Sequence, residues 1–512
     1  MKLKYISIAV LSAVILLTGC KKDFLDRTSG TNASDQVVYS TLEGLQSVMT
    51  GVYRKLYTND VTNPGFEGLH GKLFMYDSRT ADVVFSKTTW IFMDQKLWYG
   101  GKKWSTAHQN WSYYYNIILN CNHVLDNIGK FAKSDAKAIV EGQARGMRAM
   151  AYFYLIRLYQ HSYAHLNYAP AGKQTPETAP GVIIRTKVGS DDVPRSTVKD
   201  CYDLILSDLN TAKTQLQGKA ITNKSWMSYN VVCGLLSRVY LEITTPTTKA
   251  TTLPKVIENA KEARKGHGLM SLNAYREGFN NLANTEWIWG VNVQKDQCNT
   301  WRTLYDLITD NDPTISYSKY NLWFTLDNRV YDKIPANDVR REMWVADANV
   351  YRMKNKNVKY KNRPDHESAH PFMRSAEMIL NEAEAEYRLG NEGNAKTLLK
   401  ELRDARNLTG AAAAIATTGD ALLKEILMER RYELWGEGFR FFDMKRNDEA
   451  MDRPVKDNTS LWYQANLTGI PQAEMWYLNK GDVLLNMQIP MKEFEANKAL
   501  DEVKDQNPEP RL

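Results

Sequence analysis

Apolar side chains recur at three- and four-residue steps through several long stretches of the chain, which is the pattern of amphipathic helices. In the first stretch the pattern runs through Leu42, Leu45, Met49, Val52 and Leu56. The same rhythm predicts further helices, over residues 109–129, 136–160, 194–216, 226–243, 254–266, 373–389, 394–408 and 421–445, the last of which is interrupted by Gly436 and Gly438. The sequence therefore predicts an all-α dominated fold.

Small residues in the two helices expected over 373–389 and 394–408 favour a close antiparallel pair. These residues are Ala376, Ala383, Ala385 and Ala395, and a tight turn at Gly390-Asn391-Glu392-Gly393 joins the helices. The pair has nearly the ~34-residue period of tetratricopeptide repeats, although the other pairs match this period only loosely. We therefore expect tetratricopeptide-repeat-like helical pairs.

Two long stretches, residues 58–108 and 267–365, do not fit helices. They are rich in Gly, Asn, Asp, Trp and Tyr, with short strand-like pieces such as residues 287–293. Loops of this length within a compact protein usually carry function. They predict a loop-rich lobe that contains a few short strands and the binding site.

Aromatic residues gather within these two stretches. Trp90, Trp98, Tyr99 and Trp104 lie within fifteen residues and surround Gly100-Gly101, and a second group follows about two hundred residues later. Exposed rings with polar neighbours are typical of recognition sites, and the apolar face of a sugar stacks on such rings. Any single ring could instead pack in the core, but the groups together favour binding. The ligand-binding candidates are Trp90, Trp98, Tyr99, Trp104, Trp301, Tyr305, Tyr320 and Trp323.

The first residues predict secretion and a lipid anchor. Lys2 and Lys4 precede an apolar run of roughly a dozen residues, shorter than the ~20 that a membrane-spanning helix needs. The following Leu17-Thr18-Gly19-Cys20 resembles the lipobox of bacterial lipoproteins. We expect residues 1–19 to be removed as a signal peptide and Cys20 to be lipidated, which anchors the protein to a membrane. Residues 20–40 would then form a tether and residues 41–512 a single domain.

Charge and cysteine spacing exclude other classes. The chain has 66 basic and 59 acidic residues, which become 64 and 59 without Lys2 and Lys4, and no basic run that would bind nucleic acid appears. The remaining cysteines lie far apart, with no Cys-x-x-Cys pair, which argues against a metal cluster. Most should pack as small apolar residues, although one disulfide stays open. They are Cys121, Cys201, Cys233 and Cys298.

A run of acidic and basic residues near the C-terminus is the candidate for catalysis. Glu429, Glu433 and Glu437 are spaced four apart and are expected on one helix face. Arg430 and Arg440 are placed to pair with neighbouring carboxylates at three- and four-residue steps. Because a carboxylate held by arginine has a lowered pKa, it makes a poor general acid. We therefore expect these residues to form ion pairs with a structural role, and we expect that the protein is not an enzyme.

Metal-binding patterns are weak. His161 and His165 are one helical turn apart but have no third ligand beside them, and they follow the end of a predicted helix. Asp310, Asn311 and Asp312 do not have the spacing of an EF-hand loop. We expect no metal site and no cofactor, and leave a loop-bound calcium ion open.

The motifs in their order resemble the SusD/RagB-type nutrient-binding lipoproteins of Bacteroidetes. The lipid cysteine and residues 21–26 are similar to the start of many members, and residues 111–122, 145–152 and 193–198 match family helices and a helix entry. The most specific stretch is residues 429–446, which contains the structural motif Arg430, Arg431, Glu433, Glu437, Gly438, Arg440 and Asp443. Gln160-His161 and Glu509-Pro510 depart from the family pattern, which puts only local loop shapes in doubt.

The resemblance implies a binding protein on the outer face of the outer membrane. Members capture oligosaccharides, or in some cases peptides, and pass them to a SusC-like TonB-dependent outer-membrane transporter. They have no catalytic activity as a class. We therefore expect an oligosaccharide ligand, with a peptide ligand as the first alternative and a lipid-anchored hydrolase as the second.

Overall fold

The computed structural model describes residues 37–58, 68–85, 101–103, 105–168, 174–297, 303–309, 324–345, 356–408, 410, 413–453 and 477–508. The predicted signal peptide, Cys20 and most of the predicted tether lie outside these residues. The longer helices are α3 (Leu42–Arg54), α4 (Leu69–Ser78), α6 (Ser105–Ile128), α7 (Asp135–Tyr159), α8 (Val198–Leu216), α9 (Tyr229–Glu242), α10 (Lys249–Arg264), α14 (Ser375–Arg388), α15 (Glu392–Ala405), α16 (Gly419–Glu433) and α17 (Arg440–Arg446). The prediction of an α-dominated fold is confirmed.

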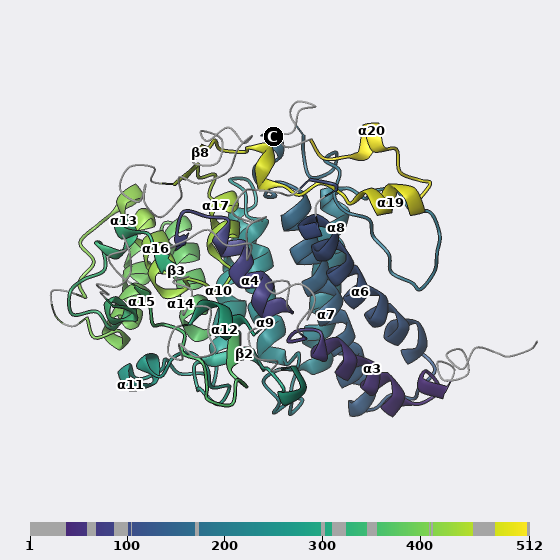
Figure 1. The fold of residues 1–512 in the computed structure, drawn as a ribbon, viewed down its shortest axis with the longest axis horizontal. Coiled ribbons are helices and arrows are strands. Elements are labelled where there is room, and N and C mark those ends of the chain that lie inside the picture. Colours follow the sequence, from purple (N-terminus) through teal and green to yellow (C-terminus); the bar gives the residue numbers. More distant parts are fainter. Residues whose placement is uncertain are drawn as a thin grey trace, which may run out of the picture.

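The long helices pack in chain order. Helix α7 lies between α6 and α8, α9 pairs with α10, and α14 packs against α10, α15 and α16. Figure 1 shows α6, α7 and α8 side by side in one half of the molecule, with α14, α15 and α16 in the other. Among the described residues, no helix combines the length and the apolar character that a membrane span requires.

Local sequence fixes where several helices begin. Helix α8 starts after Thr197, whose side chain and that of Asp200 form a capping box, so the predicted residues 194–197 precede the helix. Helix α10 begins at Lys249, five residues before the predicted start at Pro254. The backbone carbonyl of Thr248 accepts the first helical bonds there, and the proline removes only one later donor.

The predicted repeat-like pair is confirmed as α14 and α15. All four small residues named for the contact are fully buried, and three of them, Ala376, Ala383 and Ala395, share a core cluster with leucines of α15 and α16. Gly390, in the turn between the helices, has a φ of 89°, which side chains other than glycine rarely adopt.

The loop-rich lobe contains more structure than the sequence predicts. Every residue of α4 is buried, so the helix has no polar face and its sequence lacks the helical period. The short elements in and around the lobe are α11 (Leu272–Arg276), α12 (Leu304–Ile308), α13 (Asn328–Tyr331), η5 (Val339–Met343), β1 (Val83–Phe85), β2 (Trp287–Asn292), β3 (Phe324–Leu326), β4 (Trp344–Val345), β5 (Lys356–Asn357) and β6 (Ala369–Arg374). The strand predicted over 287–293 is confirmed as β2.

All of the strand pairs among the described residues are antiparallel ladders of two strands. They join β1 to β3, β2 to β6, β4 to β5, and β7 (Met451–Asp452) to β8 (Tyr477–Leu478). We call the packed long helices the helical layer. The C-terminal helices α19 (Met491–Ala496) and α20 (Glu502–Asp505) lie across one end of it (Figure 1).

Three cysteines are core residues, as expected. Cys121, Cys201 and Cys233 are free thiols within α6, α8 and α9. Burial raises the pKa of the Cys201 thiol to about 12, so this thiol is unreactive at neutral pH. Cys298 lies outside the described residues.

Candidate functional site

The two aromatic segments join the folded body at adjacent points. Strand β1 ends at Phe85, directly before one segment, and β3 begins at Phe324, directly after the other. The antiparallel register pairs Phe85 with Phe324 and Val83 with Leu326. Paired strands lie about 4.8 Å apart, so the chain leaves the body toward Trp98 beside the point where it returns from Tyr320.

Two further segment ends lie close to this ladder. The side-chain amide of Asn357 in β5 donates to the Ile308 carbonyl at the end of α12, with an N–O distance of 3.2 Å. Strands β4 and β5, which flank residues 346–355, pair through Trp344 and Asn357, and β5 lies beside β3. We call α12, β1, β3, β4 and β5 the loop frame, because the chain enters or leaves the loop segments there.

The C-terminal motif holds the base of the loop frame. The Asp82 carboxylate, directly before β1, accepts hydrogen bonds of 2.8 and 2.6 Å from the Arg431 guanidinium. Its backbone carbonyl accepts from the indole of Trp435 at 2.9 Å. Burial alone would raise the pKa of Asp82, but the charges of Arg431 and Arg440 outweigh it and lower the pKa. Asp82 is therefore a buried, ionised link between the motif and the loop frame.

Most of the predicted binding rings lie outside the described residues, namely Trp90, Trp98, Tyr99, Trp104, Trp301, Tyr320 and Trp323. Their role stays a prediction. The structure corrects Tyr305, because its ring is 1% exposed and packs edge-on against Tyr360. Its hydroxyl donates to the backbone carbonyl of Phe279, and burial raises its pKa well above the usual value. Tyr305 supports the loop frame from within the core and offers no free face to a ligand.

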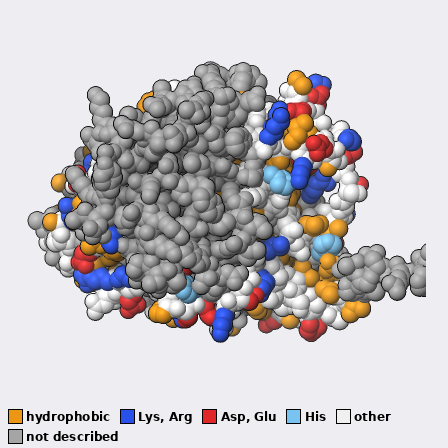
Figure 2. All heavy atoms as spheres, in the orientation of Figure 1, with side chains coloured by type: hydrophobic (Ala, Val, Ile, Leu, Met, Phe, Trp, Pro, Cys, Tyr) orange, Lys and Arg blue, Asp and Glu red, His pale blue; other side chains and the backbone are white. Residues whose placement is uncertain are grey.

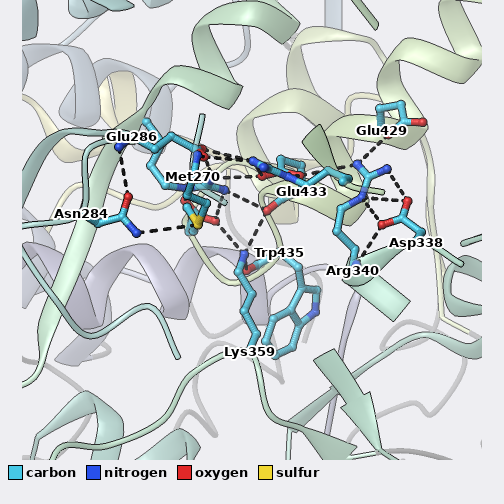
Figure 3. A network of polar contacts seen from close by, with 12 residues as sticks. Met270, Asn284, Glu286, Asp338, Arg340, Lys359, Glu429, Glu433 and Trp435 are labelled. Carbon is cyan, nitrogen blue, oxygen red and sulfur yellow. Dashed lines mark hydrogen bonds and ion pairs between the residues drawn. The ribbon is translucent and has the colours of Figure 1, made fainter. Parts of the chain in front are cut away.

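A buried network of charged side chains lies at the centre of the motif. The Glu433 carboxylate accepts from Arg374 at 2.9 Å and from Arg406 at 2.8 and 3.0 Å. Arg374 and Arg406 also pair with Glu286, at 2.5 and 3.1 Å. Figure 3 shows Glu433 between Glu286 on one side and Arg340 on the other. Since these side chains come from α15, α16, η5 and the ends of β2 and β6, the network joins the helical layer to the loop-rich lobe.

The end of the motif extends this network. Glu437 accepts from Arg374 at 2.7 and 2.8 Å and from the Lys359 ammonium at 2.6 Å. Gly438 has a φ of 85°, and a side chain there would collide with Leu73 of α4. The Asp77 carboxylate at the end of α4 accepts from the backbone N–H of Gly438 and from that of Arg440. The predicted break of the helix at the two glycines is confirmed.

The structural role expected for the motif agrees with this geometry, but the expected pairing partners were wrong. Glu437 lies beyond the end of α16 and does not share a helix face with Glu429 and Glu433. Arg430 pairs with Asp443, thirteen residues away, and Arg440 pairs with Glu449 and lies 3.4 Å from Asp82. Long-range packing places these partners, so helical spacing could not identify them.

The acidic residues of the network are poor proton donors. Burial by itself would raise the pKa values of Glu433 and Glu437, but nearby arginines outweigh it and lower both pKa values. The same balance, set by Arg446 and Arg388, lowers the pKa of Glu384. These carboxylates stay ionised at neutral pH and cannot act as general acids.

Acid should therefore destabilise the protein. Because Glu384, Glu433 and Glu437 have lower pKa values when folded than when unfolded, the unfolded chain takes up more protons as the pH falls below the ordinary value of 4.5. We expect the melting temperature, followed from pH 7 to pH 3, to fall steeply below the 4.5 at which a free glutamate titrates. Calorimetry across this range measures it, and a melting temperature that stays constant down to pH 3 would contradict the assignment.

Metal ligands do not come together in the described part of the chain, where no cluster of three His, Cys, Asp or Glu residues appears. His161 is buried beyond the end of α7, and burial with the nearby Lys445 lowers its pKa to about 3. The Nε2 atom of His165 lies 3.1 Å from the Arg446 carbonyl. The loop-bound calcium ion considered for Asp310, Asn311 and Asp312 stays a prediction, because these residues lie outside the described part of the chain.

The described surface carries both signs of charge. On the face drawn in Figure 2, blue and red side chains alternate over the coloured area without a continuous patch of either. This distribution fits the small excess of basic residues and the absence of a basic run in the sequence.

Two family models match the chain in succession. Residues 23–241 match a family described as starch-binding and associating with the outer membrane, and residues 285–509 match the SusD family. A SusD-like protein of Formosa agariphila is 24% identical over 408 residues, covering 68% of this chain and 74% of that protein. A SusD-like protein of Bacteroides ovatus is 26% identical, and the match covers 47% of this chain and 39% of that protein.

Solved structures have the same fold. A SusD-like carbohydrate binding protein from Bacteroides vulgatus superposes with a TM-score of 0.74 at 25% identity, covering 92% of this chain and 99% of the other. Surface glycan-binding protein A from Bacteroides uniformis shares the fold with a TM-score of 0.67 at 18% identity, covering 91% and 99%.

The helical layer with its loop-rich lobe is thus the fold of a class of binding proteins. The chain is a protein of the SusD/RagB type, because both family matches, the relatives and the fold agree. SusD-type proteins bind and do not catalyse, and the family is described as associated with the outer membrane.

Proposed function

We propose that the protein binds oligosaccharides at the cell surface and delivers them to a SusC-like TonB-dependent transporter. The observation that carries the proposal is the pairing of Phe85 with Phe324, since it brings the ends of both aromatic segments together. Rings from the two segments can then contribute to one ligand site. The SusD-type fold supports the same role, because relatives with this fold are described as carbohydrate-binding.

A glycan array tests the ligand class directly. The protein without residues 1–20, none of which belongs to the described body, is labelled and applied to neutral and acidic oligosaccharides and to a set of peptides. We expect binding to one family of oligosaccharides that share a linkage. Binding to peptides alone would replace the proposal by the peptide alternative, and binding to neither class would overturn it.

Delivery to a transporter requires a stable contact with it. We expect the protein to copurify in detergent with a TonB-dependent transporter from the outer membrane of its own cells. The control is a sample in which that transporter is deleted. If the protein migrates alone from cells that contain the transporter, the delivery step fails while ligand binding stands.

The lipid anchor gives a prediction of its own. Cys20→Ala should release the protein from the membrane and leave its melting temperature unchanged, because Cys20 precedes the folded body. Fractionation of cells expressing the variant without the transporter measures this. Cys201→Ala, which changes a buried thiol, is the matched control and should remain attached. A Cys20→Ala protein that still sediments with the outer membrane would contradict the anchor.

A further inference from the structure

A cavity of about 650 Å³ lies among helices α9, α10, α14, α15, α16 and α17, apart from the loop frame. Its walls come from the turn between α9 and α10, the turn between α14 and α15, α16, the end of α17 and residues just after α7. This volume is in the range of sites that enclose small molecules. No residue of the loop frame lines it, so it is a separate feature of the fold.

Positive charge predominates on the cavity wall. Lys249, Arg388 and Arg446 line it together with one acidic residue, Glu392. The Glu392 carboxylate is already engaged, because it accepts from the backbone N–H of Gly419 at 2.9 Å. Three cations and one carboxylate therefore line the cavity, and Lys249 is the cation that no carboxylate of the described residues neutralises.

The two arginines are held in place from behind. Arg388 and Arg446 both pair with Glu384, at 2.7 and 2.5 Å, and this carboxylate is fully buried. Arg388 also donates to the side-chain oxygen of Asn447 at 2.7 Å. A guanidinium has five N–H donors, and the single carboxylate of Glu384 cannot accept from all ten. Arg446 is further occupied by Asp443, whereas Arg388, whose side chain is 30% exposed and lines the cavity, keeps N–H donors for a ligand.

Lys249 is the cation without a local partner. It is the first residue of α10 and is exposed, and within the described part of the chain its ammonium has no carboxylate within ion-pair distance. Its flexible side chain can therefore turn to an anion in the cavity without breaking a contact of the fold.

Much of the rest of the wall is apolar, although Thr244, Thr245 and His165 also line it. Leu241, Leu389 and Leu423 line the cavity, together with the partly exposed ring of Tyr387. Inorganic phosphate would leave this surface without a partner. A ligand that carries a single negative group on a compact body would satisfy both kinds of wall.

We propose that this cavity binds a small organic carboxylate, with Lys249 and the donors of Arg388 on the carboxylate and the leucines and Tyr387 on the body of the ligand. Two sources supply such a group, an acidic sugar and the free carboxylate of an amino acid or short peptide. The site goes beyond the proposed oligosaccharide binding and does not depend on it.

Calorimetry on the full chain in detergent tests the site with four probes: glucuronate, galacturonate, N-acetyl-leucine and neutral glucose. We expect at least one carboxylate to bind and glucose to bind at least about tenfold more weakly, which corresponds to ~1.4 kcal/mol. Raising the salt concentration should weaken the binding of the carboxylate, because the contact is between charges. Binding of uronates alone identifies an acidic sugar, and binding of N-acetyl-leucine alone identifies the amino-acid source.

Two variants locate the binding. Lys249→Gln should weaken carboxylate binding about tenfold, whereas Lys261→Gln, the same change at an exposed position of α10 away from the cavity, should leave it unchanged. Leu423→Trp should fill the cavity and abolish binding, and its melting temperature shows whether it folds. The proposal is overturned if no carboxylate binds, if glucose binds equally well, or if Lys249→Gln binds like the parent protein. Neutral oligosaccharides should bind all three variants normally, so this failure is distinct from a failure of the proposed function.

Discussion

Glu433→Ala is expected to lower the free energy of unfolding by about 3–5 kcal/mol, because it leaves Arg374 and Arg406 buried without their shared partner. Both guanidiniums are fully buried and bond to this carboxylate. Glu286 and Glu437 remain, but of the two arginines only Arg374 bonds to Glu437, so Arg406 keeps a single carboxylate that it shares with Arg374. Urea titration monitored by tryptophan fluorescence measures the change.

A matched control separates burial from charge. Asp404 pairs with Lys400 on the exposed face of α15, so Asp404→Ala should cost less than about 1 kcal/mol. Glu433 is fully buried, so the Glu433→Ala protein should keep its ligand preference where it folds. Equal stability of Glu433→Ala and the parent, or a folded variant with a changed preference, would refute the structural role of the motif.

Trp98→Ala or Trp104→Ala is expected to weaken oligosaccharide binding roughly tenfold to a hundredfold. Stacking of one ring on a ligand contributes about 1–3 kcal/mol, by analogy with stacking on nucleobases. We expect the helices to remain folded, which the melting temperature of each variant checks. Calorimetry with the best ligand from the array, at two salt concentrations, measures the loss.

Salt distinguishes the two ligand classes in the same experiment. Stacking on a neutral sugar should respond little to salt, whereas a peptide site that depends on charge should weaken as salt screens it. Trp344→Phe is the control, since this ring packs on Trp435 in the core and should affect stability rather than affinity. If Trp98→Ala and Trp104→Ala both bind as tightly as the parent, the first aromatic segment is not the binding platform, and the site is to be sought around Trp301 and Tyr320.

The helices that the sequence predicts are those with one buried and one exposed face. Helix α8 alternates between buried Ile205 and Leu209 and exposed neighbours, so its period is visible in the sequence. Helix α4 is buried on all sides and includes the buried residues Lys72 and Asp77, so its sequence resembles that of a polar loop. Periodicity reports a difference between two faces, and α4 has none.

The sequence predicted that two aromatic segments form the site, but it did not predict how these segments are attached to the folded body. Aromatic density identified the two segments, yet only the β1–β3 register shows that they share an anchor. Tyr305 illustrates the limit, because its neighbours in sequence match those of a binding loop while its ring packs in the core. The role of Asp82 was missed as well, since its partner Arg431 is 349 residues away and no local spacing signals the pair.

That separation has a consequence for how the chain matures. Asp82 is synthesised 349 residues before its partner Arg431. Arg374 and Arg406 are also synthesised before their partner Glu433. A nascent chain that lacks residues 429–440 would have to bury Asp82 without Arg431, and Arg374 and Arg406 with only Glu286 between them, which is unfavourable. We therefore expect the core around these charges to close only once residues 429–440 are available to it.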